Sequence, residues 1–249
     1  MKIVKINKVQ LAFFAIVAFM LHLPFAFSGT KVFTANSLPS NTTTSSASTL
    51  SFSSAKIYDS LQLNLSGLSE QAFASAVKGY EYLKSKGKIG NENILSIADF
   101  SRPSSQKRFF VIDLKNFKVL FNTYVAHGQN SGAAMATQFS NVPESLQSSL
   151  GFFTTSSTYN GKNGYSMHLK GMENGINDKA EERAIVMHGA PYINENIIND
   201  RGYIGRSWGC PAVPEKLNKP IIDKIKNGSC LFIYSKNSRY QQTSKILNS

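Results

Sequence analysis

The pattern of apolar and polar positions predicts one long helix near the start of the folded part of the chain. Between Leu68 and Lys86 the apolar residues recur at helical spacing and fall on one face. That face carries Phe73, Val77, Tyr80 and Leu83. Ser69 suits the N-cap and Gly87 the stop, so the sequence also predicts where this helix begins and ends.

After this helix the pattern changes to short runs rich in apolar and β-branched residues. These runs predict strands at Ile94–Phe100, Phe109–Leu114, Val119–Val125, Leu150–Thr155, Tyr165–Leu169, Ala184–His188 and Leu231–Tyr234. Lys115-Asn116 and Asn160–Gly164 lie between neighbouring runs and predict hairpin turns. A short helix is predicted from Pro220 to Lys226, with Pro220 in its first turn and Asn227-Gly228 as its stop. The expected fold class is mainly β, a sandwich or barrel with a helix near each end.

Residues 1–28 have the layout of a secretory signal peptide. Three lysines precede an apolar run over 9–27, and Ala26 and Ser28 suit cleavage before Gly29. A retained membrane anchor is the alternative, because the run is nearly long enough to span a bilayer. Cleavage would leave a protein with no stable membrane span, located in the periplasm or cell envelope or secreted.

The remaining chain divides by composition into three parts. Residues 29–56 are expected to form a linker, since the run 36–54 holds 12 Ser or Thr in 19 residues. Residues 57–236 are expected to form the folded domain. Residues 237–249 are polar and are expected to be a frayed tail.

The formal charge is +12, from 27 Lys and Arg against 15 Asp and Glu. Signal cleavage would lower it to +9, because it removes three lysines and no acid. A basic exported protein is attracted to anionic envelope polymers, although simple solubility explains scattered charge equally well. No basic stripe is interleaved with aromatic residues, so no nucleic-acid partner is expected. Nothing in the pattern indicates an oligomeric state.

The candidate chemistry lies in one run, IVMHGAPYINENIINDRGYIGRSWGCPAV, which spans Ile185 to Val213. An apolar strand ends at His188, and Cys210 follows 22 residues later. A nucleophilic cysteine reacts as the thiolate, and a neighbouring histidine can accept its proton and stabilise the charge. Cys210 and His188 are therefore the candidate nucleophile and base.

Pro211, directly after the cysteine, has two consequences. Its ring biases Cys210 toward an extended conformation, which favours activation by His188 over activation by a helix dipole. Pro211 also lacks an N–H, so an oxyanion hole would use the backbone amides of Trp208, Gly209 or Cys210.

Two structural interpretations of Cys210 stand beside the catalytic one. A cysteine between Gly209 and Pro211 is often a small buried side chain, and in an oxidising compartment Cys210 and Cys230 would be able to form a disulfide. Cys230 itself lies in an apolar strand and is expected in the core. The Cys and His spacings match no paired-ligand pattern for zinc, so no metal site is expected.

The His188-Gly189 pair followed by Ser207-x-Gly209-Cys210 resembles the signature of the murein L,D-transpeptidases, the YkuD-like catalytic domain family. The likeness continues through Ala74–Tyr80, Phe110–Leu114, Val125–Gly132, Phe139–Pro143, Ser149–Phe152, Gly205–Pro214 and Pro220–Ile222. It therefore covers most of the chain after the linker.

This resemblance implies a cysteine acyltransferase that acts on peptidoglycan stem peptides without a metal or organic cofactor. Cys210 would attack the carbonyl of the third stem residue, release the terminal D-Ala and form a thioester. His188 would take the thiol proton, and an amine of a neighbouring stem would complete a 3–3 cross-link. The alternatives are an L,D-carboxypeptidase or amidase, in which water replaces the amine, and a non-catalytic wall-binding module.

The resemblance also implies a substrate site around the pair. Gly209 and Trp208 would supply backbone donors to an oxyanion. The residues expected to contact the substrate are His127, Ser207, Arg206 and Gly189. For His127 a hydrogen-bonded structural role is the alternative.

Two positions depart from the broader family. Trp208 replaces the usual His before Gly-Cys, and Ala212 stands where many members carry an Arg. Trp208 is expected either to wall the pocket or to pack beneath its loop. The group that orients His188 has three candidates: a backbone carbonyl, Ser207 or an asparagine within 194–199.

Overall fold

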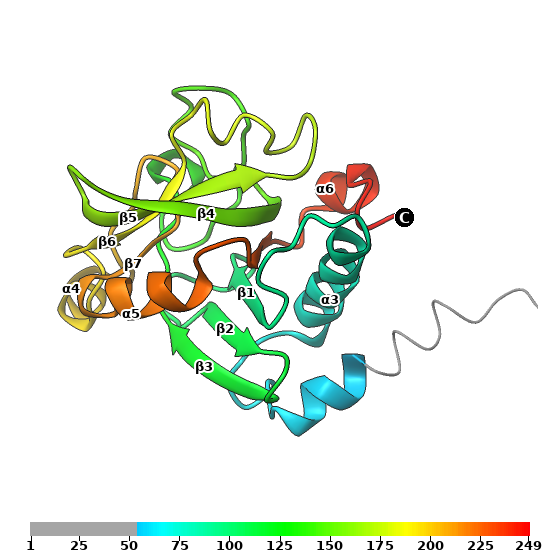
Figure 1. Ribbon diagram of the computed structural model, residues 1–249. Helices are drawn as coiled ribbons and strands as arrows, with labels where there is room; N and C mark the ends of the chain where they lie inside the picture. The colour runs from blue at the N-terminus through cyan, green and yellow to red at the C-terminus, as the bar shows by residue number, and fades with distance from the viewer. Residues whose placement is uncertain (1–53) are drawn as a thin grey trace, which may run out of the picture. The chain divides into compact units, whose positions relative to one another are not determined.

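The computed structural model describes residues 54–249, so the predicted signal peptide and nearly all of the predicted linker lie outside the described residues. The strands are β1 Ile94–Asp99, β2 Phe109–Asp113, β3 Lys118–Thr123, β4 Gly151–Gly161, β5 Gly164–Gly171, β6 Val186–Ala190, β7 Ala212–Pro214 and β8 Cys230–Tyr234. They form one sheet in the order β3-β2-β1-β8-β4-β5-β6-β7 (Figure 1). The mainly β prediction is confirmed, although β7 has no counterpart among the predicted strands.

The two ends of this strand order are joined by isolated bridges rather than by a continuous ladder. The pairs β1–β8 and β6–β7 are parallel, and the other neighbours are antiparallel. The chain that leaves β3 reaches β7, where the Ala126 amide donates to the Ala212 carbonyl at 2.8 Å. The sheet is therefore nearly closed on itself, which brings the 126–132 segment next to β7.

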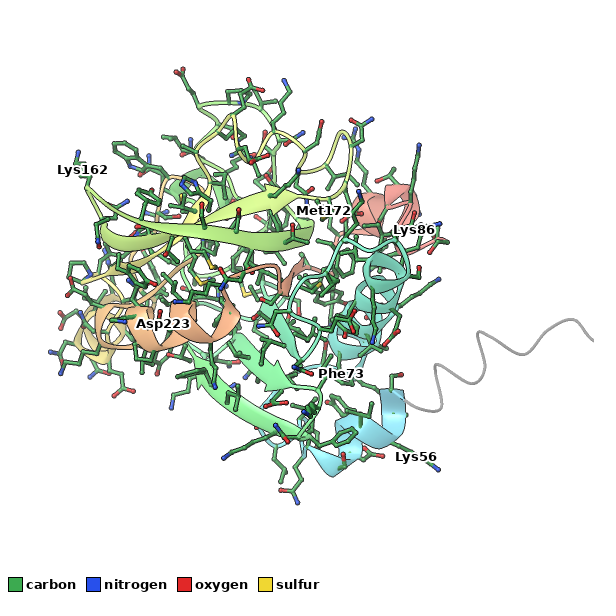
Figure 2. The ribbon with its side chains drawn as sticks, viewed as in Figure 1. Lys56, Phe73, Lys86, Lys162, Met172 and Asp223 are labelled. Carbon is green, nitrogen blue, oxygen red and sulfur yellow. The ribbon has the colours of Figure 1, made fainter. Side chains whose placement is uncertain are left out.

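The helices are α3 Glu70–Ser85, α4 Glu195–Arg201, α5 Glu215–Ile225 and α6 Ser238–Thr243, with a 3₁₀ turn η1 at Gln129–Ser131. Residues 54–60 are also helical, so regular structure begins within the predicted linker. Ser69 caps α3 as predicted, since its side chain accepts from the Ala72 amide. Figure 2 shows Phe73 turned inward from α3, whereas Lys86 and Lys162 point outward. Burying such an aromatic side chain contributes about 2–3 kcal/mol.

The start of α5 corrects a prediction. Proline favours the first turn of a helix, so Pro220 was the expected start, but α5 begins at Glu215, directly after β7. Pro220 lies inside the helix, and its missing N–H leaves the Lys216 carbonyl without a helical donor. The buried side chains Ile221, Ile222 and Ile225 hold the helix on the sheet through this point. Tertiary packing thus extends the helix by five residues before the start that Pro220 indicates.

The C-terminal segment corrects a second prediction. Residues 237–249, expected to fray, contain α6, which lies next to α3 (Figure 1). The Tyr240 hydroxyl donates to Glu173 at 3.0 Å, and the Ser244 hydroxyl donates to the same carboxylate. Burial raises the pKa of Glu173, and these donors supply the hydrogen bonds that a buried carboxylate requires. Glu173 therefore helps to anchor this polar tail, in which Tyr240 and Ile246 are also buried.

Candidate active site

The sheet topology brings the predicted nucleophile and base together. In the parallel pair β6–β7, His188 lies opposite Ala212, which is two residues after Cys210. The Cys210 sulfur rests on the start of β6, where it accepts from the Val186 amide at 3.5 Å and lies 3.8 Å from the Ala184 carbonyl oxygen. Residues 22 positions apart in the sequence thus lie close together, His188 in β6 and Cys210 in the loop that leads into the adjacent strand β7.

His188 has one ring nitrogen occupied and one free. Its Nδ1 lies 2.9 Å from the Gly189 carbonyl oxygen, and because a carbonyl only accepts, Nδ1 carries the proton. Nε2 makes no hydrogen bond within the described residues and has its lone pair available. The orienting group is therefore the backbone carbonyl, one of the three candidates. Burial lowers the pKa of His188, which favours the neutral imidazole.

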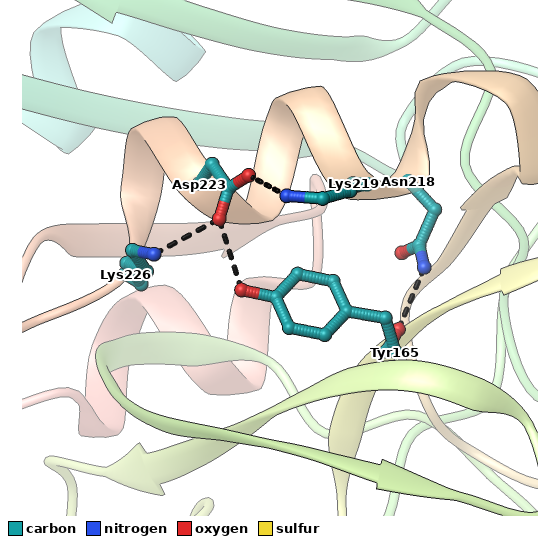
Figure 3. Close-up of polar contacts among 5 residues, drawn as sticks. All are labelled: Tyr165, Asn218, Lys219, Asp223 and Lys226. Carbon is teal, nitrogen blue, oxygen red and sulfur yellow. Dashed lines mark hydrogen bonds and ion pairs between the residues drawn. The ribbon is translucent and has the colours of Figure 1, made fainter.

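Gly189 faces α5 rather than the expected substrate. A Cβ at this position would lie 2.9 Å from Asn218 Cβ and 3.2 Å from Glu215 Cα. Asn218 also donates to the Tyr165 carbonyl at 2.6 Å, and the Tyr165 hydroxyl donates to Asp223 at 2.9 Å (Figure 3). Gly189 therefore serves the close packing of α5 against β5 and β6.

The two cysteines differ in environment, and neither is in a disulfide. Cys230 is fully buried in β8, and burial raises the pKa of its thiol. The disulfide alternative is thus wrong, and the core prediction for Cys230 is confirmed. Cys210 is partly exposed; burial raises its pKa, whereas the Val186 amide and the Arg183 charge lower it.

Ser207 braces the loop that carries the cysteine. Its hydroxyl donates to the Cys210 carbonyl at 2.6 Å and accepts from the Gly209 amide at 3.1 Å. Ser207 is 4% exposed, so it supports the loop rather than offering the substrate contact expected of it. Gly209 has φ +124°, a conformation that favours glycine.

The same bonds decide which amides are available. The Gly209 amide, an expected oxyanion donor, is occupied by Ser207. The amides of Trp208 and Cys210 donate no hydrogen bond to any residue that the structure describes.

Trp208 and Arg206 lie on the outside of this loop. Trp208 is 72% exposed, so it does not pack beneath the loop. Arg206 donates to the Gly132 carbonyl at 3.0 Å and to the Gln129 carbonyl at 3.3 Å. Arg206 thereby ties the cysteine loop to η1, while Trp208 is accessible beside Cys210.

His127 does not line the cleft as expected but has the structural role named as its alternative. It is fully buried, its Nδ1 accepts from Arg108 at 2.7 Å, and its Nε2 donates to the Gly132 carbonyl at 3.2 Å. Burial and then the Arg108 charge lower its pKa to about 4. Its carbonyl accepts from the Ser207 amide at 2.9 Å, so His127 positions the cysteine loop.

Two arginines that support the site are not indicated by the sequence. Arg108 is fully buried and Arg183 half-buried, and both bond chiefly to backbone or hydroxyl oxygens. Nothing in their local sequence distinguishes them from exposed arginines.

Among the residues that the structure describes, no group of His, Cys, Asp and Glu is arranged to hold a metal ion, and no helix is both long and apolar enough to cross a membrane.

Comparison with solved structures finds weak likenesses. An L,D-transpeptidase from Mycobacterium smegmatis has a TM-score of 0.36 at 15% identity, with 57% of this chain and 59% of that chain covered. L,D-transpeptidase 3 from Mycobacterium tuberculosis has 0.37 at 10%, covering 57% and 61%. The helical cell shape determining protein Pgp2 (K307A mutant) from Campylobacter jejuni has 0.39 at 12%, covering 65% and 57%. The matched part thus spans less than two thirds of each of these proteins.

No curated protein matches this chain. A family model does: the one described as "L,D-transpeptidase catalytic domain" matches residues 64–234. That match spans the sheet, α3, α5 and the loop of Cys210. The chain belongs to the L,D-transpeptidase catalytic domain family.

Proposed function

We propose that this protein is an exported peptidoglycan L,D-transpeptidase with Cys210 as nucleophile and His188 as general base. The observation that carries the proposal is the free Nε2 of His188, on the strand that supports the Cys210 sulfur. Family membership supports the reaction class, and the N-terminal signal pattern supports export to the periplasm or cell envelope.

The first half-reaction forms the thioester. His188 Nε2 takes the thiol proton, and the Cys210 sulfur attacks the carbonyl carbon of the third stem residue. The tetrahedral intermediate then expels the terminal D-Ala, whose amine receives the proton from His188. In the second half-reaction an acceptor amine attacks the thioester and passes a proton to His188, which returns it to the leaving thiolate.

The resting pair is neutral on this mechanism. Burial raises the pKa of Cys210 and lowers the pKa of His188, so both shifts favour thiol and imidazole over thiolate and imidazolium. His188 therefore acts as a base during attack rather than as the partner of a preformed ion pair.

The free amides of Trp208 and Cys210 are the proposed oxyanion donors. They flank Gly209, whose own amide is engaged by Ser207. Loss of one such donor costs about 3–4 kcal/mol of transition-state stabilisation.

Intact-mass analysis after incubation with a stem tetrapeptide or a carbapenem tests the nucleophile. We expect a covalent adduct that maps to Cys210 and is lost in Cys210→Ala. Cys230→Ala is the matched control and should keep the adduct, because Cys230 is buried in β8. A folded protein without an adduct would favour a non-catalytic wall-binding module.

Analysis of the muropeptide products tests the outcome of the second half-reaction. We expect 3–3 dimers. Tripeptides alone would show that water is the acceptor and that the protein is an L,D-carboxypeptidase.

A further inference from the structure

A strained turn lies directly beneath the Cys210 sulfur. Ala184 has φ +51°, a left-handed conformation that costs a non-glycine residue on the order of 1 kcal/mol. This turn leads from Arg183 into β6 and places the Ala184 carbonyl and the Val186 amide against the sulfur. The sulfur therefore rests on the backbone that immediately follows Arg183.

The Arg183 guanidinium binds the neighbouring loop, 140–149, with four hydrogen bonds. Its acceptors are the Ser140 carbonyl at 2.8 Å, the Ser149 hydroxyl at 2.5 Å, the Gln147 carbonyl at 2.7 Å and the Ser145 hydroxyl at 3.3 Å. A Cβ on Gly209 would lie 2.8 Å from the Gln147 oxygen and 3.4 Å from Arg183 Nη2. Arg183 thus holds this loop against the peptide that precedes Cys210.

All four acceptors are uncharged, and Arg183 forms no ion pair with a described carboxylate. A half-buried cation without a counter-ion exerts a stronger field than an exposed or paired one. The titratable groups that interact with the sulfur are Arg183 and Tyr192, which follows β6, while His188 lies on the strand that supports the sulfur. Of these, only the Arg183 guanidinium is positively charged in the resting enzyme.

We propose that Arg183 is a positioning residue for the Cys210 thiolate. Its charge favours the ionised sulfur that forms during attack, and its hydrogen bonds hold the loop that shapes the Gly209–Cys210 peptide. This inference rests on the proposed function, in which Cys210 is the nucleophile.

Substitutions at Ser145 separate the effect of the Arg183 charge from the effect of the Arg183 hydrogen bonds. In the full chain, Ser145→Asp places a carboxylate on Arg183 without removing the arginine, and Ser145→Asn is the matched neutral control. The rate of Cys210 alkylation by iodoacetamide against pH, read by mass spectrometry, measures the thiol pKa. We expect Ser145→Asp to raise that pKa by about one unit, a roughly tenfold loss of thiolate at neutral pH, and Ser145→Asn to leave it unchanged.

Replacement of Arg183 itself provides a second test by the same titration. Arg183→Gln should raise the Cys210 pKa by about as much, whereas Arg183→Lys should retain much of the shift and Arg201→Gln, at an exposed arginine at the end of α4, should cause none. Equal pKa values in Ser145→Asp and Ser145→Asn would overturn the proposal even if Arg183→Gln does not fold. The titration needs no stem peptide, so a failed transfer assay with a shifted thiol pKa would reject the proposed function instead.

Discussion

Two histidines, His127 and His188, each precede a glycine in the sequence, but their ring nitrogens have different hydrogen-bond partners. His127 and His188 each follow an apolar segment, but His127 has both ring nitrogens occupied whereas His188 has one. Arg108 can only donate, so His127 carries its proton on Nε2; the Gly189 carbonyl can only accept, so His188 carries its proton on Nδ1. The tautomer, and with it the nitrogen that keeps a lone pair, is set by the group that contacts Nδ1: Arg108 for His127 and the Gly189 carbonyl for His188.

The largest expected effect is on kcat, and it tests whether His188 is the base and His127 a structural residue. His188→Gln should lower kcat by about 10²–10⁴-fold, because it removes the general base. His127→Gln should reduce activity much less at a temperature where it is folded. Transfer assays paired with Tm measurements separate loss of catalysis from loss of folding. An equal loss of kcat in folded His127→Gln would contradict the structural role of His127.

Acid unfolding tests the buried histidine. The pKa of His127 is about 4 in the folded protein and about 6.5 in the unfolded chain, so the unfolded state binds the proton first as pH falls. Stability is therefore complete above about pH 6.5 and declines toward pH 4, by up to about 3 kcal/mol from this group.

Urea unfolding at neutral pH and near pH 4.5 measures this decline. His127→Gln should be less stable than the parent at neutral pH but lose less on acidification. If the two proteins show the same pH slope, His127 is not the group responsible.

The glycines after the two histidines should differ in tolerance. At Gly128 an alanine Cβ would lie 2.4 Å from the Leu146 carbonyl oxygen, which is backbone, whereas at Gly189 the nearest atom is 2.9 Å away on the Asn218 side chain. We expect Gly189→Ala to cost about 1–3 kcal/mol and Gly128→Ala to cost more, since backbone yields less than a side chain. Thermal unfolding checks the order, and a more stable Gly128→Ala than Gly189→Ala would contradict it.

Local pattern was sufficient for most elements and for choosing Cys210 and His188 as the candidate pair. The cap at Ser69, the helical face of α3 and the apolar runs of seven strands depend on neighbours within a few residues, and all are present. Strand β7 was missed because its three residues are too short to show a period. Helix α6 was missed because its anchor, Glu173, lies more than sixty residues away in the sequence.

The sequence by itself determined the mainly β class, the boundaries of α3 and the candidacy of Cys210 and His188, because residue type and local spacing carry that information. Only the tertiary structure decided which cysteine is accessible, which nitrogen of His188 is free and why His127 is not a second base. Burial and the bond from Arg108 to His127 depend on elements distant in sequence, so no local pattern records them. The partner of His188 is the adjacent Gly189 carbonyl, but the ring orientation that makes this bond is a property of the folded chain.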